Sequence, residues 1–219
     1  MLKITMQDGS YIRVTENHSM ILNNGDRVEA KYLKTGQRLK LSEVESSGNV
    51  HEKGAYIKGF LVGDGTLMRD DNPYLYLYSP KYICEDKLID SLKEIDVTNE
   101  YYGRAIKNPS FSKESTTGVD RKVMKGLVAR KHELTSWVID NKKRLPVESF
   151  SWDNKSKYEF IAGLFDADGT ASDTKNGFMY QIASIHKSFL EDLQTLLKTI
   201  GVHSKISLMR KAGKTDFND

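Results

Sequence analysis

Hydrophobic and polar residues follow two different periods along this chain of 219 residues, and the change of period divides it. In residues 1–41, short β-prone runs flank Asp8-Gly9 and Asn24-Gly25, two dipeptides that favour tight hairpin turns. From residue 52 onward, runs with helical spacing alternate with strand-like runs. The polar stretch SEVESSGN (42–49) lies between the two regions and has the composition of a linker. We therefore expect a small all-β piece followed by an α+β region.

The second region has a repeated order of elements: helix, two strands, helix, two strands and helix, after which the order starts again. The first round is expected at 54–65 (helix), 73–79 (strand), 84–95 (helix), 100–106 and 121–131 (strands) and 133–141 (helix), and the second at 157–169 (helix), 178–185 (strand), 187–201 (helix) and 204–211 (strand). An internal repeat of this kind predicts pseudo-twofold symmetry with a site near the axis. The second round is shorter than the first, so we expect an incomplete second copy in this chain.

The stretches that open the two rounds share one pattern. YIKGFLVGDGT (56–66) and FIAGLFDADGT (160–170) each begin with apolar residues, carry glycine at the fourth position and end in Asp-Gly-Thr. Residues four apart share a face of a helix, so small residues at that spacing allow a second helix to approach closely. The small residues are Gly59 and Gly63 in the first stretch and Gly163 and Ala167 in the second. They predict that the two helices pack against each other.

The same packing would bring Asp64 and Asp168 together at the C-terminal ends of the two helices. Two neighbouring carboxylates repel each other unless cations lie between them. Carboxylates and nearby backbone carbonyls, here those of Gly63 and Ala167, supply the oxygen ligands that suit Mg²⁺ or Mn²⁺. The arrangement therefore fits a metal-assisted displacement at phosphorus.

Two other interpretations of the motif are open at this point. Each Asp-Gly-Thr is also a reasonable helix end followed by a turn, because glycine is favoured after a helix C-terminus. FDADGT (165–170) also resembles the D-x-D-G-T nucleophile motif of haloacid-dehalogenase-type phosphatases, in which the first aspartate attacks phosphorus. The corresponding position in the first stretch is Val62, which cannot act as a nucleophile. The repetition of the motif favours the metal site over both alternatives.

Composition and charge narrow the class of protein. A chain with 38% hydrophobic residues can bury a core. No uninterrupted apolar stretch approaches the roughly 18 residues needed to cross a bilayer, and no secretory signal opens the chain, so we expect an intracellular location without a membrane partner. Cys84 is the single cysteine, which excludes an internal disulfide and a Cys-rich zinc site. The net charge of +3 is mild, but residues 104–144 hold eleven Lys or Arg and four acids, which indicates either a solvated face or a polyanion-binding surface.

The two motifs resemble those of a known enzyme family. IKGFLVGDG (57–65) and IAGLFDADG (161–169) are similar to the paired motifs of monomeric, two-repeat LAGLIDADG homing endonucleases. The second stretch matches at seven of nine positions, and the first departs at Lys58, Val62 and Gly63. The final aspartate of the motif is present in both stretches.

The resemblance implies a fold and a chemistry. Each repeat in that family has the order αββαββα, and its four strands form a saddle that reads a long site in the major groove of double-stranded DNA. The last aspartate of each motif, here Asp64 and Asp168, binds divalent metal over the minor groove, and both DNA strands are cut with short 3′ overhangs. NKKRLP (141–146) resembles the basic K-x-[IL]-P segment between the repeats, which implies that Lys143 stabilises phosphate charge or orients water. A basic helix C-terminus is the alternative for Lys143.

The strand-like runs carry side chains suited to a DNA-reading surface. Tyr74, Tyr76 and Tyr78 alternate with leucines, so one face can pack on helices while the other offers aromatic and hydroxyl contacts. Lysine and arginine can serve either phosphate or guanine. The predicted basic contacts are Lys122, Lys125, Arg130, Lys131, Lys205, Arg210 and Lys211. A simple solvent-exposed sheet is the alternative.

The first region resembles a second family. GSYIRVTENHSMIL (9–22) is similar to the G-x-x-I-x-x-T-x-x-H block of inteins and other Hint domains, and AKYLKTGQRLKL (30–41) is similar to the segment that follows it. The resemblance implies that Thr15 and His18 activate a peptide bond at an upstream splice junction; a turn threonine and a surface histidine are the alternative. The chain contains no upstream nucleophile block and no final His-Asn. We therefore expect that it does not splice alone, and that a second polypeptide would supply the missing intein pieces.

These observations predict an α+β fold with two pseudo-symmetric αββαββα repeats, the second incomplete, preceded by a small all-β Hint-like piece. The expected domains are residues 1–50 for the splicing piece, 51–149 for the first repeat and 150–219 for the second. The expected function is that of an intein-associated, site-specific homing endonuclease that makes Mg²⁺-dependent double-strand breaks with 3′ overhangs. The alternative is a non-cleaving split-intein fragment, or a nucleic-acid-binding remnant or maturase.

Overall fold

The structure is a computed structural model that describes residues 1–40, 48–95, 108–116, 119–175 and 177–209. The chain divides into two compact units. One unit comprises residues 1–45 together with 197–219, and the other comprises residues 46–196. Most of the linker predicted at 42–49 lies outside the described residues, and so does the strand predicted at 100–106.

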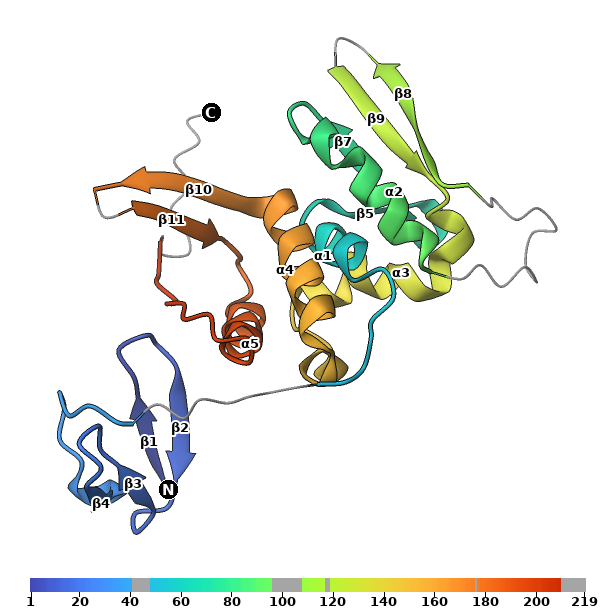
Figure 1. Cartoon of the computed structure of the whole chain (residues 1–219). Coiled ribbons are helices and arrows are strands. Elements are labelled where there is room, and N and C mark those ends of the chain that lie inside the picture. Colours follow the sequence, from blue (N-terminus) through green and yellow to red (C-terminus); the bar gives the residue numbers. More distant parts are fainter. Residues whose placement is uncertain (41–47, 96–107, 117–118, 176, 210–219) are drawn as a thin grey trace. The chain divides into compact units, whose positions relative to one another are not determined.

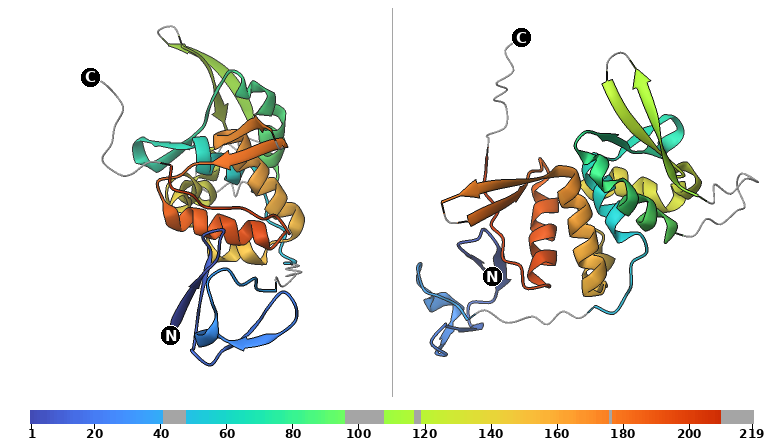
Figure 2. Two further views of the ribbon diagram at one scale, coloured as in Figure 1. Left: turned by 90° about the vertical axis from the view of Figure 1, so that its left-hand side faces the viewer. Right: turned by 45° about the horizontal axis from the view of Figure 1, so that its top comes forward.

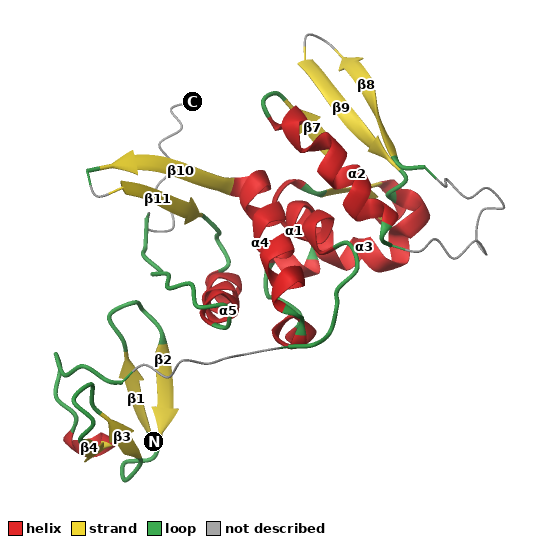
Figure 3. Ribbon diagram, in the orientation of Figure 1, coloured by secondary structure: helices red, strands yellow, loops and turns green. Residues whose placement is uncertain are grey.

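Two antiparallel hairpins form the N-terminal part of the first unit. Its strands are β1 (Leu2–Thr5), β2 (Tyr11–Val14), β3 (Ser19–Ile21) and β4 (Arg27–Glu29), followed by the short 3-10 helix η1 (Ala30–Tyr32). β1 pairs with β2 and β3 with β4. Gly9 and Gly25 have φ of 86° and 93°, the left-handed conformation that glycine adopts without strain. The four strands and both turn dipeptides predicted from the sequence are confirmed, as Figure 3 shows.

The first unit buries few side chains. Among its described residues, Ala30 alone is buried, whereas Tyr11, Ile12 and Ile21 are exposed. The segment after residue 200 contacts the β1–β2 turn: the Ile206 amide donates to the carbonyl of Asp8 at 3.2 Å. Because this single bond does not build a ladder, the strand predicted at 204–211 is absent from its described part, residues 204–209.

A charged contact joins the same turn to Lys198, which belongs to the same unit. Lys198 Nζ lies 2.8 Å from Asp8 Oδ2, and the amide and hydroxyl of Ser10 donate to Asp8 Oδ1. Partial burial raises the pKa of Asp8, but the hydrogen bonds from Lys198 and Ser10 outweigh it and lower that pKa to about 2. The Asp8 carboxylate therefore helps to hold the turn and Lys198 together within the first unit at neutral pH.

Helices dominate the core of the second unit. Figures 1 and 2 show α1 and α4 side by side at its centre. The helices are α1 (Ala55–Asp64), α2 (Glu85–Lys93), α3 (Lys131–Val138), α4 (Asn154–Asp168) and α5 (Lys187–Lys198). Asp153 precedes α4, and its carboxylate accepts a hydrogen bond from the Ser156 amide and so caps the helix. α1 is buried from Ala55 to Val62; the one charged residue in this stretch, Lys58, pairs with Glu52.

An aromatic cluster joins α3 and α4 in this core. The rings of Trp137, Trp152 and Phe160 lie with centroids 5.6–5.9 Å apart in tilted or edge arrangements. Trp152 and Phe160 are almost completely buried. Aromatic pairs at such separations each contribute about 0.5–1.5 kcal/mol beyond their buried area. This cluster helps to fix α4 against α3 and the segment before α4.

Small antiparallel sheets flank the helices of the second unit. Their strands are β5 (Thr66–Met68), β6 (Asn72–Tyr74), β7 (Tyr76–Tyr78), β8 (Ser110–Thr116), β9 (Val119–Lys125), β10 (Gly169–Thr174) and β11 (Gly177–Ile182). β5 pairs with β6, β10 pairs with β11, and the third sheet has the order β7-β9-β8. The 3-10 helices are η2 (Arg69–Asp71), η3 (Lys81–Cys84), η4 (Val128–Arg130), η5 (Asp140–Lys142) and η6 (Val147–Ser151). The mixed α and β composition predicted from the sequence is confirmed.

Several strands differ from the prediction. The run at 73–79 is divided into β6 and β7, which belong to different sheets. The strand predicted at 121–131 ends at Lys125, because Gly126 has φ of 104° and turns the chain into η4. β5, β8 and β10 were not predicted: β5 is only three residues long, and SFSKEST in β8 and GTASDT in β10 are polar and lack an apolar alternation.

Candidate metal centre at the paired helix ends

The site begins where α1 and α4 cross. A Cβ added to Gly59 would overlap the carbonyl oxygen of Phe160 and lie 2.9 Å from the Leu164 nitrogen. A Cβ added to Gly163 would overlap the carbonyl oxygen of Tyr56 and lie 3.0 Å from the Phe60 nitrogen. Each glycine thus lies against the main chain of the other helix, so the predicted close approach is confirmed.

One turn further on, small residues again face each other. A Cβ on Gly63 would lie 2.5 Å from Cβ of Ala167 and 3.2 Å from Cγ of Asp168. Both helices end here, because the amides of Gly65 and Gly169 close the last turns onto the carbonyls of Leu61 and Phe165. The residues that end the helices are Asp64 and Asp168. The sequence pattern of small residues followed by acid therefore delivers two carboxylates to neighbouring helix ends.

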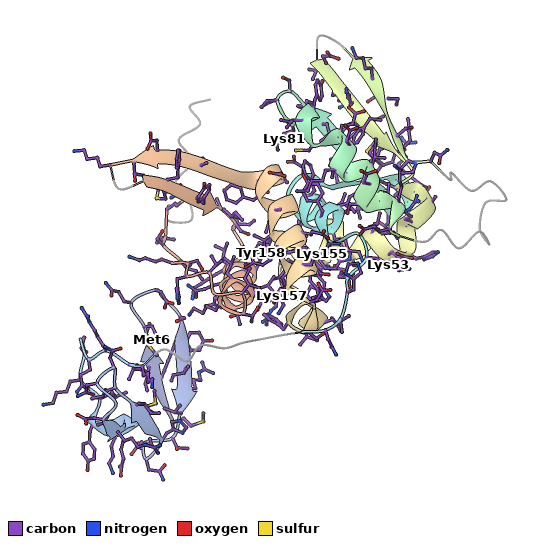
Figure 4. The ribbon with its side chains drawn as sticks, viewed as in Figure 1. Met6, Lys53, Lys81, Lys155, Lys157 and Tyr158 are labelled. Carbon is purple, nitrogen blue, oxygen red and sulfur yellow. The ribbon has the colours of Figure 1, made fainter. Side chains whose placement is uncertain are left out.

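Lys81, at the start of η3, lies between the two helix ends. Its Nζ is 2.5 Å from Asp64 Oδ2 and 2.5 Å from the main-chain oxygen of Ala167. Lys81 thus contacts the carboxylate of the first motif and the carbonyl of the second. Figure 4 labels Lys81 and shows it near the C-terminal end of α4. The sequence gives no motif around Lys81, so its role at the site was not predicted.

A second lysine approaches from η5. Lys142 Nζ donates to the main-chain oxygens of Gly65 at 2.8 Å and Gly63 at 3.3 Å. Desolvation lowers the pKa of Lys142, and the negative charges of Asp168 and Asp64 oppose that shift. The predicted lysine, Lys143, is exposed instead, and its main-chain oxygen accepts a hydrogen bond from Ser188 Oγ. Of the two consecutive lysines, Lys142 is therefore the one whose side chain reaches the motif.

The electrostatics of the site favour a cation. Desolvation by the helix ends raises the pKa of Asp168, and the neighbouring carboxylate of Asp64 raises it further. Lys81 and Lys142 oppose this shift, but the net pKa of Asp168 stays above its ordinary value. The Asp168 carboxylate therefore gains stability from added positive charge.

Oxygen atoms make up the donor set at the two helix ends. They are the carboxylates of Asp64 and Asp168 and the main-chain oxygens of Gly63, Gly65 and Ala167. The described residues contain no group of three or more His, Cys, Asp or Glu suited to a metal ion. A pair of carboxylates with carbonyls still fits Mg²⁺, since this ion keeps several waters and is often bound through one or two carboxylates.

A cavity of about 270 Å³ opens beside Asp64. Its other lining residues are Thr66, Tyr76, Tyr78, Ser79, Pro80 and Lys81. The cavity therefore connects the end of α1 with β7 and with the turn before η3. It is a concave surface next to the carboxylate at which a substrate group can approach.

The predicted tyrosines lie on the strands beside this cavity. Leu75 and Leu77 are fully buried, whereas Tyr76 is partly exposed and Tyr78 is 43% exposed, so the predicted alternation is confirmed. Tyr74 stacks on Tyr76 with ring centroids 6.2 Å apart. The Arg121 guanidinium lies 4.1 Å from the centre of the Tyr76 ring. Aromatic and cationic groups thus share one face of β7 and β9.

The predicted basic contacts near this sheet divide into two groups. Lys122, which forms an ion pair with Glu85, and the exposed Lys125 lie on β9. Arg130 is buried, and its guanidinium donates to the main-chain oxygens of Ile95 and Gly126. Arg130 therefore does not lie on the sheet surface. Its role in the structure is to hold the turn after β9, because its planar donors satisfy two main-chain acceptors.

The remaining predicted residues lie elsewhere. Lys131 begins α3, and its Nζ donates to the main-chain oxygen of Asp70. Lys205 is exposed in the first unit, while Arg210 and Lys211 lie outside the described residues. Thr15 and His18 are both exposed in the turn between β2 and β3, where the His18 amide donates to the carbonyl of Thr15.

Comparison with known proteins finds a family that matches part of the chain, and several similar proteins. Residues 156–218 match the LAGLIDADG-like domain family. The chain is 28% identical over 222 residues to the ribonucleoside-diphosphate reductase NrdEB subunit alpha of Bacillus subtilis (strain 168), which covers 94% of this chain and 20% of that protein. It is 25% identical over 242 residues to the ribonucleoside-diphosphate reductase large subunit of Invertebrate iridescent virus 6, which covers 100% of this chain and 22% of that protein.

A relative of another enzyme class is a DNA polymerase of Thermococcus litoralis. It is 27% identical over 236 residues, which covers 94% of this chain and 13% of the polymerase. The chain therefore spans a fifth or less of the length of the B. subtilis reductase subunit and of this polymerase. Over the described residues, none of the helices is both long enough and apolar enough to cross a membrane.

Proposed function

We propose that the chain, whose residues 156–218 match the LAGLIDADG-like domain family, is an intein-associated, site-specific DNA endonuclease. It cuts both strands of double-stranded DNA in a reaction that depends on Mg²⁺ or Mn²⁺ and leaves 3′ overhangs. Residues 51–149 and 150–219 act as two pseudo-symmetric repeats, and residues 1–50 are a Hint-like piece. What supports the proposal most is the meeting of Asp64 and Asp168 at adjacent helix ends beside two lysines.

The roles of the site residues follow from their atoms. Asp64 and Asp168, with the main-chain oxygens of Gly63 and Ala167, would hold the metal ion. When bound, the ion supplies positive charge that stabilises the charge developing on the scissile phosphate. Lys142 holds the carbonyls of Gly63 and Gly65, at the end of the first motif, in place, and its ammonium adds positive charge beside the carboxylates.

Binding of DNA would use the sheet beside the cavity. Tyr74, Tyr76 and Tyr78 offer rings and hydroxyls, and the exposed Lys125 offers an ammonium group on β9. Lys122 lies opposite the buried Leu77 and would have to leave Glu85 to contact DNA. Lysines of this kind contact phosphates and position the duplex, which makes the affinity depend on salt. The two arms of β8 and β9 project beyond the helices, which gives the sheet a length along which a duplex can extend, as Figure 1 illustrates.

The intein association is supported by the nature of the relatives. A reductase subunit and a DNA polymerase are different kinds of enzyme, yet both align with 94% of this chain. A segment that recurs within unrelated host proteins behaves as an inserted element. Thr15 and His18, the residues of the proposed splicing block, are both exposed in the turn between β2 and β3.

Plasmid cleavage tests the proposal. The purified chain is incubated with supercoiled plasmid that carries the uninterrupted form of its host gene, with and without Mg²⁺. We expect linear product only with metal, and no linear product from Asp64→Asn or Asp168→Asn. Asp90→Asn, an exposed aspartate on α2, is the matched control and should cut normally. Cutting by the combined Asp64→Asn, Asp168→Asn variant at the normal rate would refute the site, and salt-dependent binding without cutting would favour a DNA-binding remnant.

A further inference from the structure

Lys81 occupies a position between the two motifs that its sequence context does not explain. Its ammonium is 2.5 Å from Asp64 Oδ2 and 2.5 Å from the main-chain oxygen of Ala167, so it joins groups 103 residues apart in the chain. A carboxylate and a backbone carbonyl are the two kinds of oxygen that a magnesium site also uses. The lysine ammonium is a compact point charge with three donors, and it can satisfy both oxygens at once.

From this geometry we infer that Lys81 is a placeholder cation: it occupies the metal position between the motifs and must leave when a divalent ion binds there. The inference rests on the proposed metal site and adds to it a residue that controls its occupation. An ion at about 2.1 Å from each oxygen would lie close to the ammonium nitrogen, because both would share the same pair of ligands. Two cations so close repel each other strongly, so binding of one displaces the other.

The structure offers a place for the displaced side chain. The cavity of about 270 Å³ beside Asp64 is lined by Lys81 itself, by Ser79 and Pro80 of the preceding turn, and by the tyrosines of β7. The Lys81 side chain is 32% exposed, so rotation toward solvent requires little repacking. In the metal-free protein, Lys81 reduces the repulsion between Asp64 and Asp168, and a bound ion takes over this role.

Metal affinity in the absence of DNA tests the inference. Binding of Mn²⁺ to the full chain is measured by electron paramagnetic resonance for the wild type and for Lys81→Met. Removal of a competing cation should strengthen binding about tenfold, which corresponds to about 1.4 kcal/mol. Lys81→Gln keeps polar contacts without the charge, so its Mn²⁺ affinity should also rise. This second variant covers the case in which Lys81→Met does not fold. Lys93→Met, which removes an exposed lysine paired with Asp90 on α2, is the matched control and should bind as the wild type does.

The outcomes separate the inference from the proposed function. If wild type binds Mn²⁺ in an Asp64-dependent manner, and the Lys81 variants bind equally or more weakly, Lys81 is not a placeholder while the metal site stands. If wild type and the Lys81 variants all fail to bind Mn²⁺, the metal site itself is wrong and the inference falls with it. A melting temperature that drops in metal-free Lys81→Gln and recovers with Mn²⁺ is a second expected result.

Discussion

Addition of one methyl group at the helix crossing tests how the two carboxylates are brought together. In Gly163→Ala, the new Cβ would overlap the carbonyl oxygen of Tyr56 and lie 3.0 Å from the Phe60 nitrogen. These are main-chain atoms, so the clash cannot be relieved by rotation of a side chain, and α1 and α4 must move apart. The substitution thus acts on the packing that positions Asp64 and Asp168 without touching either carboxylate.

The size of the effect follows from two opposing contributions. Alanine is favoured over glycine within a helix by about 1 kcal/mol. Overpacking of a well-packed core costs about 1–3 kcal/mol, and a clash with main chain belongs at the upper end of that range. The net destabilisation is therefore about 2 kcal/mol, which for a chain of this size lowers the melting temperature by about 4–8 °C.

The free energy of unfolding in urea and the affinity for Mn²⁺ test this prediction. We expect Gly163→Ala to be destabilised and to bind Mn²⁺ more weakly than wild type, because the carboxylates are displaced. Lys155→Ala is the control: it removes an exposed lysine on α4 whose pairing with Glu159 contributes at most about 0.5 kcal/mol. A Gly163→Ala protein as stable as wild type, or more stable, would refute the reasoning, since it would mean that the helices are not in main-chain contact.

Substitutions at Gly63, Lys142 and Asp8 test three further contacts. Gly63→Ala should be destabilised by about 1–2 kcal/mol, because the new Cβ would lie 2.5 Å from Cβ of Ala167. In urea unfolding, the combined Gly63→Ala, Ala167→Gly variant should recover most of this loss. No recovery would contradict the facing arrangement of the two residues. Lys142→Met should reduce DNA cleavage at least tenfold, whereas Lys143→Met should retain more than half of the rate; the reverse order in a single-turnover assay would assign the active-site role to Lys143. Asp8→Asn should destabilise the protein by about 1 kcal/mol at pH 7, because the Asp8 pKa of about 2 lies below its unfolded value of 3.8. The depressed pKa of Asp8 adds stability that is present above pH 4 and is lost as the pH falls toward 2. The difference in unfolding free energy between wild type and Asp8→Asn should therefore shrink over that range. A constant difference would argue against the ionised contact.

The helix ends of the site could be predicted because their information is local. Small residues at a spacing of four, followed by Asp-Gly, determine both the contact face and the end of each helix. The alternation of tyrosines with Leu75 and Leu77 likewise follows from the strand period, and the structure confirms which face is buried. The hairpins at Asp8-Gly9 and Asn24-Gly25 follow from the turn preference of glycine.

The lysines of the site could not be predicted in the same way. Lys142 and Lys143 are consecutive in a basic run, and only the path of η5 decides which side chain points toward the motif. Lys81 approaches Ala167 across 86 positions of the chain, and no local pattern encodes a contact of that range. Arg130 was expected on the surface because it is charged, but main-chain acceptors at Ile95 and Gly126 make its burial favourable.

We propose that the ends of α1 and α4 together form one metal site. The most direct measurement is a crystal structure of the chain soaked in Mn²⁺, with the ion located by its anomalous scattering. We expect a peak within about 2.5 Å of a carboxylate oxygen of both Asp64 and Asp168, with the Lys81 ammonium moved away from Asp64. A well-ordered site without a peak, or a peak bound by neither aspartate, would contradict it.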